Sequence, residues 1–273
     1  MAFHINHFSK NLIGYTDVNI YLPIGTEYED ELDPNEKFQV LWLLHGHSGN
    51  FSEWSRYSAI EKLAMDHGFA VVMPCGANSS YNDMPTGMKY YTYITEELPA
   101  FLRRRFPLSD KREDNFIAGL SMGGIGAAKL GFANPDKYSA IGIFSGGPDD
   151  PLTSDHFRSD NPVRAREVAC TFFPTDFEPG KPNDIWGNFL KLKDSGYPMP
   201  LIYDICGSED FVYPSFERFK TFAEESGMAE YVNFETCEGV HNFDVWDYAV
   251  HRFVEQLPLK NRGIWRRWYD SVH

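Results

Sequence analysis

Short apolar runs alternate with longer amphipathic stretches along most of the chain. Residues 39–44 (QVLWLL) and 69–73 (FAVVM) are apolar at almost every position, as strands covered on both faces of a sheet must be. The other predicted strands are 18–22, 115–119, 140–145, 201–206 and 232–237, and the predicted helices are 52–67, 91–106, 214–226, 242–256 and one that opens at Ser121. Because strands and helices alternate, we expect an α/β fold with a mostly parallel central sheet and helices on both faces.

Residues 147–199 interrupt this alternation. The segment contains seven prolines and several aromatic residues, and its pattern predicts only short helices. It is long for a connection within a compact domain, which favours a functional insertion over a plain loop. The length of 273 residues is common for one α/β domain. We therefore expect a single domain over residues 1–273 that carries a cap, or lid, at about 147–199.

The formal net charge of −14 arises from acidic residues that are spread along the chain. Such a charge repels polyanions, so neither nucleic acid nor an anionic membrane surface is expected as a partner. A basic and aromatic segment at 262–269 fits a docked tail or a subunit contact better than a site for stacked bases. The chain shows no secretory signal and no apolar run that could cross a bilayer, and its four cysteines are widely spaced. We expect a cytoplasmic protein without a disulfide framework.

The strongest chemical signal is the run Gly119-Leu120-Ser121-Met122-Gly123. It follows an apolar strand and precedes small residues that suit a closely packed helix. A nucleophilic serine must project from a tight strand-to-helix turn, and glycines two positions to either side remove side chains that would collide there. The helix N-terminus also places the positive end of its dipole beside a developing oxyanion. We therefore interpret Ser121 as the nucleophile of a serine esterase.

A serine hydroxyl needs a base, and in the α/β-hydrolase arrangement an acid and then a histidine follow the serine along the chain. His241 lies on the loop between the last predicted strand and the last helix, at the end of the sheet that would display the serine. His251 falls within a helix and His273 is the last residue. His241 is therefore the predicted base.

The acid should lie on the loop after the preceding strand, which is 201–206. Asp210 comes just past the end of that strand and is the predicted acid, which would orient the imidazole and stabilise the imidazolium. Asp204 lies inside the strand, where a buried structural carboxylate is the alternative interpretation. Glu209 is adjacent and fits a solvated or supporting residue.

The oxyanion hole needs two backbone N–H donors, and we expect them from His47 and Met122. Met122 directly follows the nucleophile, and His47 lies in the glycine-containing loop 45–50 after the strand 39–44. The spacing His45-x-His47 could also hold a metal ion, but zinc needs a third protein ligand and no obvious cluster supplies one. No metal site is predicted.

The predicted substrate pocket consists of Gly46, Asn78, Tyr81, Trp186 and Trp246. The segment 78–83 follows a strand at the same end of the sheet, and an ordinary polar turn is the alternative. Core packing is the alternative for Trp246, which lies on the helix after His241.

Four segments resemble the esterase D-like family of α/β-hydrolases. They are LLHGHSGNFSEW at 43–54, VVMP at 71–74, YYTYITEELPAFLRRRFP at 90–107 and FIAGLSMGGIGAAKL at 116–130. The chain looks closest to the bacterial tributyrin (acetyl) esterase branch, which is related to S-formylglutathione hydrolases and feruloyl esterases, and the resemblance spans about residues 5–255. It implies that Ser121 is the nucleophile, Asp210 the acid and His241 the base, with the amides of His47 and Met122 in the oxyanion hole. It also implies a small ester substrate with a short acyl chain, no cofactor and a possible homo-oligomer.

Three other functions remain open at this stage. The first is hydrolysis of a thioester, S-formylglutathione, by the same residues, against which the acidic surface argues weakly. The second is a feruloyl or acetyl-xylan esterase, in which the aromatic cap would form a wider groove. The third is a binding protein of the same fold without activity, although such relatives usually lack one of the three catalytic residues.

Overall fold

The computed structural model describes residues 1–24, 37–84, 87–148 and 180–260. Within these ranges the chain forms one eight-stranded sheet with the order β1-β2-β4-β3-β5-β6-β7-β8. The strands are β1 (Ala2–Ser9), β2 (Gly14–Tyr21), β3 (Val40–Leu44), β4 (Ala70–Pro74), β5 (Asn115–Leu120), β6 (Ala140–Phe144), β7 (Leu201–Gly207) and β8 (Val232–Cys237). β1 and β2 are antiparallel to their neighbours, and every other pairing is parallel. The predicted mostly parallel α/β sheet is confirmed.

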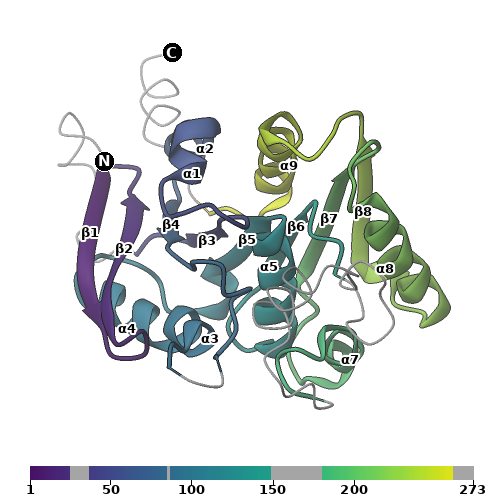
Figure 1. Cartoon of the computed structure of the whole chain (residues 1–273), viewed down its shortest axis with the longest axis horizontal. Helices are drawn as coiled ribbons and strands as arrows, with labels where there is room; N and C mark the ends of the chain where they lie inside the picture. The colour runs from purple at the N-terminus through teal and green to yellow at the C-terminus, as the bar shows by residue number, and fades with distance from the viewer. Residues whose placement is uncertain (25–36, 85–86, 149–179, 261–273) are drawn as a thin grey trace, which may run out of the picture.

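The two faces of the sheet are covered by different helices (Figure 1). Helices α1 (Glu53–Tyr57), α2 (Ile60–His67) and α9 (Phe243–Gln256) pack on one face, and α4 (Leu98–Arg103), α5 (Met122–Ala133), α7 (Ile185–Lys191) and α8 (Tyr213–Glu225) pack on the other. Alternate residues of β3 show the two cores: Leu41 and Leu43 face the first set of helices, whereas Trp42 and Leu44 face the second. A strand buried on both faces explains why β3 is an uninterrupted apolar run.

Two predicted helices are broken in the structure. The predicted helix 52–67 is divided into α1 and α2 at Ser58, whose backbone is extended and whose hydroxyl bonds the carbonyl of Trp54. The predicted helix 91–106 consists of α3 (Tyr90–Thr92), a π-helix (Tyr93–Glu97) and α4. Glu97 at the end of the π-helix accepts hydrogen bonds from the hydroxyl of Ser9 and from the backbone of the β1–β2 turn. Short 3₁₀ turns occur at Arg112–Asp114, Leu192–Asp194 and Ala229–Tyr231.

The strand β1 was not predicted from the sequence. It lies at the edge of the sheet, and its residues alternate between exposed and partly buried positions, with polar side chains among them. Such a strand lacks the continuous apolar character by which the central strands were recognised.

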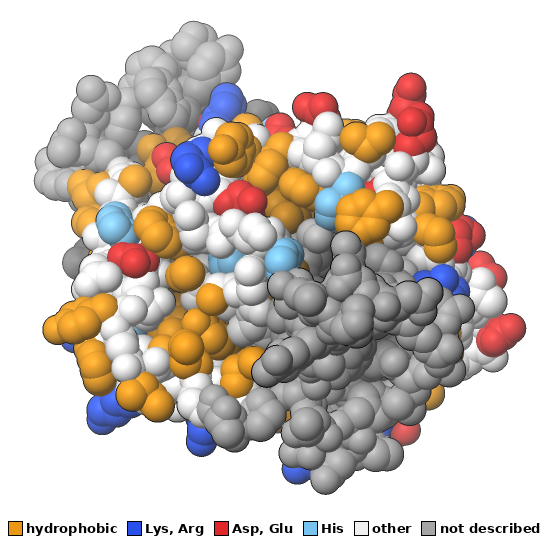
Figure 2. Space-filling view, viewed as in Figure 1, with side chains coloured by type: hydrophobic (Ala, Val, Ile, Leu, Met, Phe, Trp, Pro, Cys, Tyr) orange, Lys and Arg blue, Asp and Glu red, His pale blue; other side chains and the backbone are white. Residues whose placement is uncertain are grey.

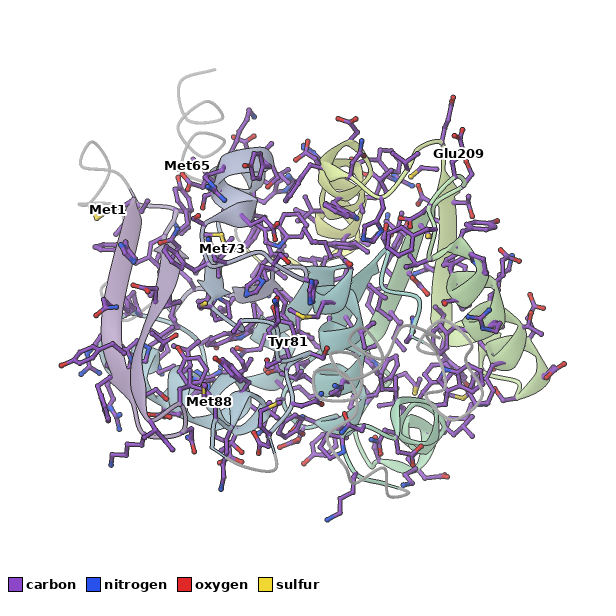
Figure 3. All side chains as sticks on the ribbon, in the orientation of Figure 1. Met1, Met65, Met73, Tyr81, Met88 and Glu209 are labelled. Carbon is purple, nitrogen blue, oxygen red and sulfur yellow. The ribbon has the colours of Figure 1, made fainter. Side chains whose placement is uncertain are left out.

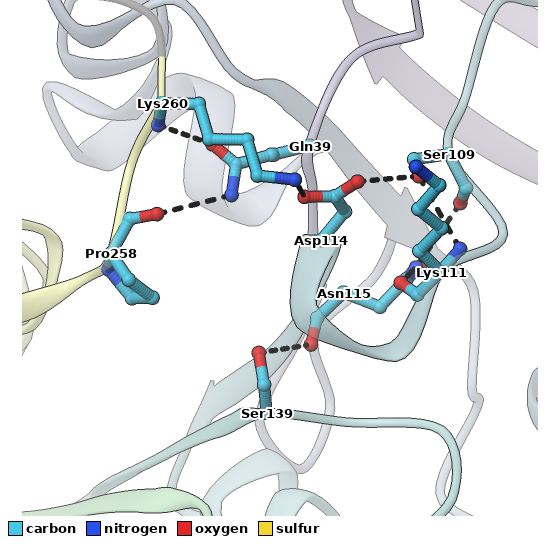
Figure 4. A network of polar contacts seen from close by, with 8 residues as sticks. All are labelled: Gln39, Ser109, Lys111, Asp114, Asn115, Ser139, Pro258 and Lys260. Carbon is cyan, nitrogen blue, oxygen red and sulfur yellow. Dashed lines mark hydrogen bonds and ion pairs between the residues drawn. The ribbon is translucent and has the colours of Figure 1, made fainter.

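A polar network joins the C-terminal segment to the amino ends of the central strands (Figure 4). The Lys260 ammonium is paired with the buried carboxylate of Asp114, and the backbone N–H of Lys260 donates to the side chain of Gln39 at 2.7 Å. The Gln39 amide in turn donates to the carbonyl of Pro258 at 3.2 Å. Asp114 also accepts a hydrogen bond from the hydroxyl of Ser109. This network lies at the end of the sheet opposite to the loops that carry the predicted catalytic residues.

Most of the predicted cap, residues 149–179, lies outside the described residues, as does the basic and aromatic segment 262–269. The described remainder of the cap contains α7, which begins at the N-cap residue Asp184. Phe189 on α7 is fully buried and packs against Phe132 of α5 and Phe219 of α8. The described part of this segment is therefore joined to the main core through α7. Of the four cysteines, Cys75, Cys206 and Cys237 are described, and each is a free thiol.

Candidate active site

Ser121 lies at the junction between β5 and α5 in a strained backbone conformation. Its φ of 53° and ψ of −119° are outside the regions that L-residues ordinarily occupy. Its N–H donates to the carbonyl of Phe144 on the neighbouring strand at 2.8 Å, which helps to hold the turn. A Cβ at Gly119 would lie 2.5 Å from the backbone of Gly123, and a Cβ at Gly123 would lie 2.5 Å from the carbonyl oxygen of Leu44. The two glycines flanking the serine are therefore required by close packing of the backbone.

A continuous chain of hydrogen bonds links Ser121, His241 and Asp210. The Nε2 atom of His241 lies 2.9 Å from the Oγ atom of Ser121, and its Nδ1 atom lies 2.9 Å from each carboxylate oxygen of Asp210. Because a carboxylate can only accept, Nδ1 carries the proton and Nε2 is left to accept the proton of the serine hydroxyl. The Asp210 carboxylate is fully buried, and 17% of the His241 side chain is exposed. This geometry suits transfer of a proton from Ser121 to His241.

The environment of Asp210 favours its ionised form. Burial by itself would raise the pKa of this carboxyl group. The hydrogen bonds from His241 and from the backbone N–H of Val212, at 2.9 Å, lower the pKa by more, so that the group titrates below its ordinary value. The buried carboxylate therefore remains charged opposite the imidazole.

The two alternative acids occupy different environments. Asp204 is fully buried inside β7, and neither of its carboxyl oxygens has a hydrogen-bond partner within the described ranges. Burial raises the pKa of Asp204 well above its ordinary value. Glu209 is exposed on the loop after β7, and its label in Figure 3 lies at the outer edge of the molecule. His251, the alternative base on α9, lies 3.8 Å from Asp247.

The loop after β3 packs directly against the strand that carries the nucleophile. A Cβ on Gly46 would lie 2.4 Å from the Leu120 side chain and 3.6 Å from Cβ of Ser121. The N–H of Gly46 donates to Glu53 at 3.1 Å, that of Ser48 to Asn78 at 2.7 Å and that of Gly49 back to Gly46 at 3.1 Å. These three amides are thus already used within the protein. Met122 is the first residue of α5, where helix geometry provides no acceptor within the helix for its N–H.

Glu53 was not singled out from the sequence. Its carboxylate is half-buried under the loop after β3, and burial raises its pKa above the ordinary value despite the hydrogen bond from Gly46. A Cβ at Gly49 would lie 2.3 Å from the same carboxylate, which shows how closely the loop wraps around it. The only hint in the sequence is that Glu53 follows the glycine loop at the start of a helix.

The five residues predicted to line the pocket have different surroundings. Gly46 contacts the nucleophile strand, and Trp246 lies edge-on to the His241 ring with centroids 4.9 Å apart. Asn78 binds the backbone of the loop after β3, as described above. Tyr81 is fully buried, with its hydroxyl on the carbonyl of His45. Trp186 stacks on Phe222 of α8 with centroids 4.1 Å apart.

Apolar side chains that the sequence did not single out surround His241. The ring of Phe211 lies 4.4 Å from the His241 ring between centroids and is 63% exposed, and Val240 is 46% exposed. Phe243 contacts Trp246 edge-on at 5.0 Å. Figure 2 shows hydrophobic side chains gathered on the face in view, whereas acidic ones are scattered over it. An apolar rim suits an apolar part of a substrate.

His45 of the pair His45-x-His47 has no ring nitrogen left to bind a metal ion. The Nδ1 atom of His45 donates to the carbonyl of Gly46 at 2.7 Å, and its Nε2 atom accepts the N–H of Gly76 at 2.8 Å, so both ring nitrogens are occupied. Among the described residues, no group of three or more His, Cys, Asp or Glu side chains could hold a metal ion. Within those same ranges, no helix combines the length and the apolar character that crossing a membrane requires.

A mostly parallel eight-stranded sheet with a strained serine between β5 and α5 defines a serine hydrolase of the α/β-hydrolase fold. Residues 9–258 match the sequence profile of the family described as "Putative esterase", and the chain belongs to this esterase family. The resemblance to esterase D-like enzymes and the expected fold class are thereby confirmed.

Three relatives illustrate the similarity. The acetyl esterase of Caldicellulosiruptor saccharolyticus is 31% identical over 266 residues, which cover 93% of this chain and 96% of that protein. The structure of the fluorophosphonate-binding serine hydrolase F of Staphylococcus aureus has a TM-score of 0.81 and 27% identity, covering 94% of this chain and 98% of that one. The S-formylglutathione hydrolase of the same organism has a TM-score of 0.79, also with 27% identity and with coverage of 94% and 98%.

Proposed function

We propose that this esterase hydrolyses short-chain acyl esters, with acetyl-like acyl groups, through a triad of Ser121, His241 and Asp210. The observation that carries this proposal is the unbroken chain of 2.9 Å contacts from the Asp210 carboxylate through the imidazole to the serine oxygen. A serine hydroxyl is a weak nucleophile, and a positioned base with an oriented tautomer is what activates it.

In the first half of the reaction, the Oγ atom of Ser121 attacks the ester carbonyl while Nε2 of His241 takes the hydroxyl proton. The carbonyl oxygen becomes an oxyanion, and the imidazole becomes an imidazolium beside the ionised Asp210. When the tetrahedral intermediate collapses, the bond to the alcohol breaks and His241 returns its proton to the departing oxygen. Ser121 is left as an acyl ester.

The second half repeats the steps with water as the nucleophile. His241 takes a proton from water as its oxygen adds to the acyl carbonyl. When this intermediate collapses, the bond to Ser121 Oγ breaks, His241 returns its proton to that oxygen, and the carboxylic acid is released. In both halves we assign the oxyanion to the backbone amides of His47 and Met122. The Met122 amide is at the start of α5, where the helix dipole also favours negative charge.

The preference for short acyl groups is supported by the acetyl esterase relative, which matches over nearly the whole of both chains. A second candidate is hydrolysis of a thioester such as S-formylglutathione, because the structure of an S-formylglutathione hydrolase is also similar over nearly the whole chain. The same three residues would serve either reaction. The apolar rim around His241 and the formal charge of −14 favour a neutral ester over an anionic thiol carrier.

The test is a comparison of kcat/KM for p-nitrophenyl esters of increasing acyl length, for S-formylglutathione and for methyl ferulate. We expect p-nitrophenyl acetate or butyrate to be preferred, and a higher kcat/KM on S-formylglutathione would replace the first candidate with the second. Ser121→Ala should lower kcat by several orders of magnitude, on the scale of ~10⁶ for loss of the nucleophile in serine hydrolases. The same variant should not be labelled by a fluorophosphonate probe, and near-normal turnover by it would overturn the triad.

A further inference from the structure

Lys129 is a buried lysine on the helix that begins at the nucleophile. It lies about two turns after Ser121 on α5, and only 2% of its surface is exposed. Its Nζ atom donates hydrogen bonds to the carbonyl of Ser80, at 2.8 Å, and to the side-chain oxygen of Asn82. Burial lowers the pKa of Lys129 to about 7. Burial of a lysine costs free energy, so the presence of Lys129 at this position indicates that its two hydrogen bonds have a structural role.

The loop of residues 76–82, to which Lys129 is hydrogen-bonded, has a strained backbone. Ala77, Ser80 and Tyr81 have positive φ values of 45°, 47° and 56°, which non-glycine residues rarely adopt. Such conformations persist only when surrounding contacts fix them. The hydroxyl of Ser79 supplies two of these contacts, since it donates to the carbonyl of Gly76 at 2.6 Å and accepts the N–H of Tyr81 at 3.0 Å. Lys129 supplies another from the helix.

The side chain of Tyr81 extends from this strained loop towards the loop after β3. Its ring is fully buried near the middle of the molecule, where Figure 3 labels it. A Cβ on Gly76 or on Gly126 would each lie 2.4 Å from the ring, so the ring is enclosed between its own loop and α5. The hydroxyl of Tyr81 donates to the carbonyl of His45 at 2.9 Å.

His45 is the first residue of the loop that contains His47, and residues 76–81 hold both its ring and its backbone. Its Nε2 accepts the N–H of Gly76 while its Nδ1–H donates to the carbonyl of Gly46, so a single neutral tautomer satisfies both contacts. Its carbonyl accepts the Tyr81 hydroxyl and lies against α5, because a Cβ at Gly123 would be 2.7 Å from that oxygen.

We propose that Lys129 and Tyr81 are positioning residues that fix the backbone of Gly46 and His47 at the correct distance from the Ser121 oxygen. α5 begins directly after the nucleophile and carries Lys129 further along. One helix therefore fixes the position of the Met122 amide and, through Lys129, that of the loop with the His47 amide. The inference rests on the proposed function, since it assumes that the His47 amide binds the oxyanion. It adds a second group of residues, none of which touches the substrate, to the three that perform the chemistry.

The most direct test is Tyr81→Phe, which removes one hydroxyl and keeps the buried ring. A misplaced oxyanion donor weakens binding of the transition state more than binding of the substrate. We therefore expect kcat on p-nitrophenyl acetate to fall by about 10- to 100-fold with KM within about twofold of the parent value. The inhibition constant of a trifluoromethyl ketone, which forms an oxyanion on Ser121, should rise by a similar factor.

Tyr93→Phe is the matched control. Tyr93 is equally buried, and its hydroxyl lies 2.9 Å from Nε2 of His7 on β1 and also bonds the side chain of Thr16 on β2, far from His45. Each variant removes one buried tyrosine hydroxyl with its polar contacts, so a general loss of stability should appear in both. Rates are to be expressed per active site titrated with a fluorophosphonate, so that an unfolded fraction does not count as a lower kcat.

Lys129→Met provides a second measurement, because methionine can fill the same buried space without donating. We expect the same loss of kcat at unchanged KM, and the double variant with Tyr81→Phe should lose less than the product of the two single losses. The proposal is overturned if titrated Tyr81→Phe retains kcat as Tyr93→Phe does, or if its effect lies in KM. Failure of the proposed function itself would be recognised separately, by an active Ser121→Ala.

Discussion

Asp204 and Asp210, which lie inside β7 and on the loop that follows it, have carboxyl groups whose pKa values are displaced in opposite directions. Burial without a hydrogen-bond partner among the described residues raises the pKa of Asp204 well above its ordinary value. Asp210 is buried too, but hydrogen bonds from His241 and Val212 bring its pKa below the ordinary value. Two neighbouring acids are thus held in opposite protonation states, one neutral in the core and one charged in the site.

Asp204→Asn should change how stability depends on pH. In the folded protein Asp204 stays protonated far above pH 3.8, whereas in the unfolded chain it ionises near that value. Folding therefore takes up a proton, and stability decreases as pH rises from about 4 towards the folded pKa, by about 1.4 kcal/mol per pH unit from this residue. The asparagine variant should lack this decrease, and urea unfolding at pH 5, 6, 7 and 8 measures it.

The exposed residue Asp194 provides the control for that series. Asp194→Asn should follow the parent protein at every pH, because the site is exposed. If the free energies of unfolding of the parent and of Asp204→Asn stay parallel across this range, Asp204 is ionised in the folded state and the assignment of a neutral carboxyl is wrong.

Asp210→Asn should lower kcat by about 10⁴-fold with little change in fold. The amide nitrogen of asparagine would face Nδ1 and favour the wrong tautomer of His241, as loss of the charge does in other serine hydrolases. Glu209→Gln is the matched control, because Glu209 is the adjacent acid and is exposed. Steady-state kinetics on p-nitrophenyl acetate give the result. Loss of activity in the Glu209 variant instead would reassign the acid.

Gly123→Ala should damage both stability and catalysis. The added Cβ would lie 2.5 Å from the Leu44 carbonyl oxygen and 2.7 Å from that of His45, and both are backbone atoms that cannot move aside cheaply. We expect the loop after β3 to shift away from Ser121, with kcat lowered by about 100-fold and a lower Tm. Gly14→Ala is the control, since its Cβ would have no neighbour closer than 3.8 Å. Equal Tm and kcat for the two variants would contradict the packing argument.

Phe211→Ala should alter selectivity for the alcohol part of the ester. His241 returns a proton to the departing alcohol, so that group must lie beside the imidazole and near the exposed ring of Phe211. We expect kcat/KM for benzyl acetate to fall by about 10-fold while that for methyl acetate is nearly unchanged. Tyr197→Ala removes another exposed aromatic ring, at the opposite end of the sheet, and should affect neither ester. An equal loss on both esters would mean that Phe211 acts through His241 instead.

The strands that could be predicted from the sequence are those that are buried along their whole length. β3, β4 and β5 are buried at every position, and apart from Asn115 at the start of β5 they contain no polar side chain, so each can be recognised without a partner. β1 pairs on one side only and alternates between exposed and buried positions, and this pattern was overlooked. The break between α1 and α2 is fixed by the Ser58 hydroxyl, which bonds back to Trp54, and by Asp247 on α9, which accepts the N–H of Ala59 from a distant part of the chain.

The residues of the candidate site also differ in how far the sequence alone indicates them. Ser121, Asp210 and His241 follow one another along the chain just past the ends of β5, β7 and β8, and their prediction was based on this order and position. Lys129 contacts a loop that is distant in sequence, and Glu53 is covered by the loop after β3. Their residue types alone give no sign of these contacts. Tyr81 was predicted to line the pocket, and its side chain is fully buried.

The polar network around Asp114 has a consequence for the order in which the protein folds. The contact between Gln39 and Lys260 joins residues separated by 221 positions, and the contact of Lys260 with Asp114 spans 146. During synthesis the N-terminal strands leave the ribosome long before residue 260 does. β3 and β5 therefore leave the ribosome without the final polar partners of their amino ends, and these bonds can form only after residue 260 has emerged.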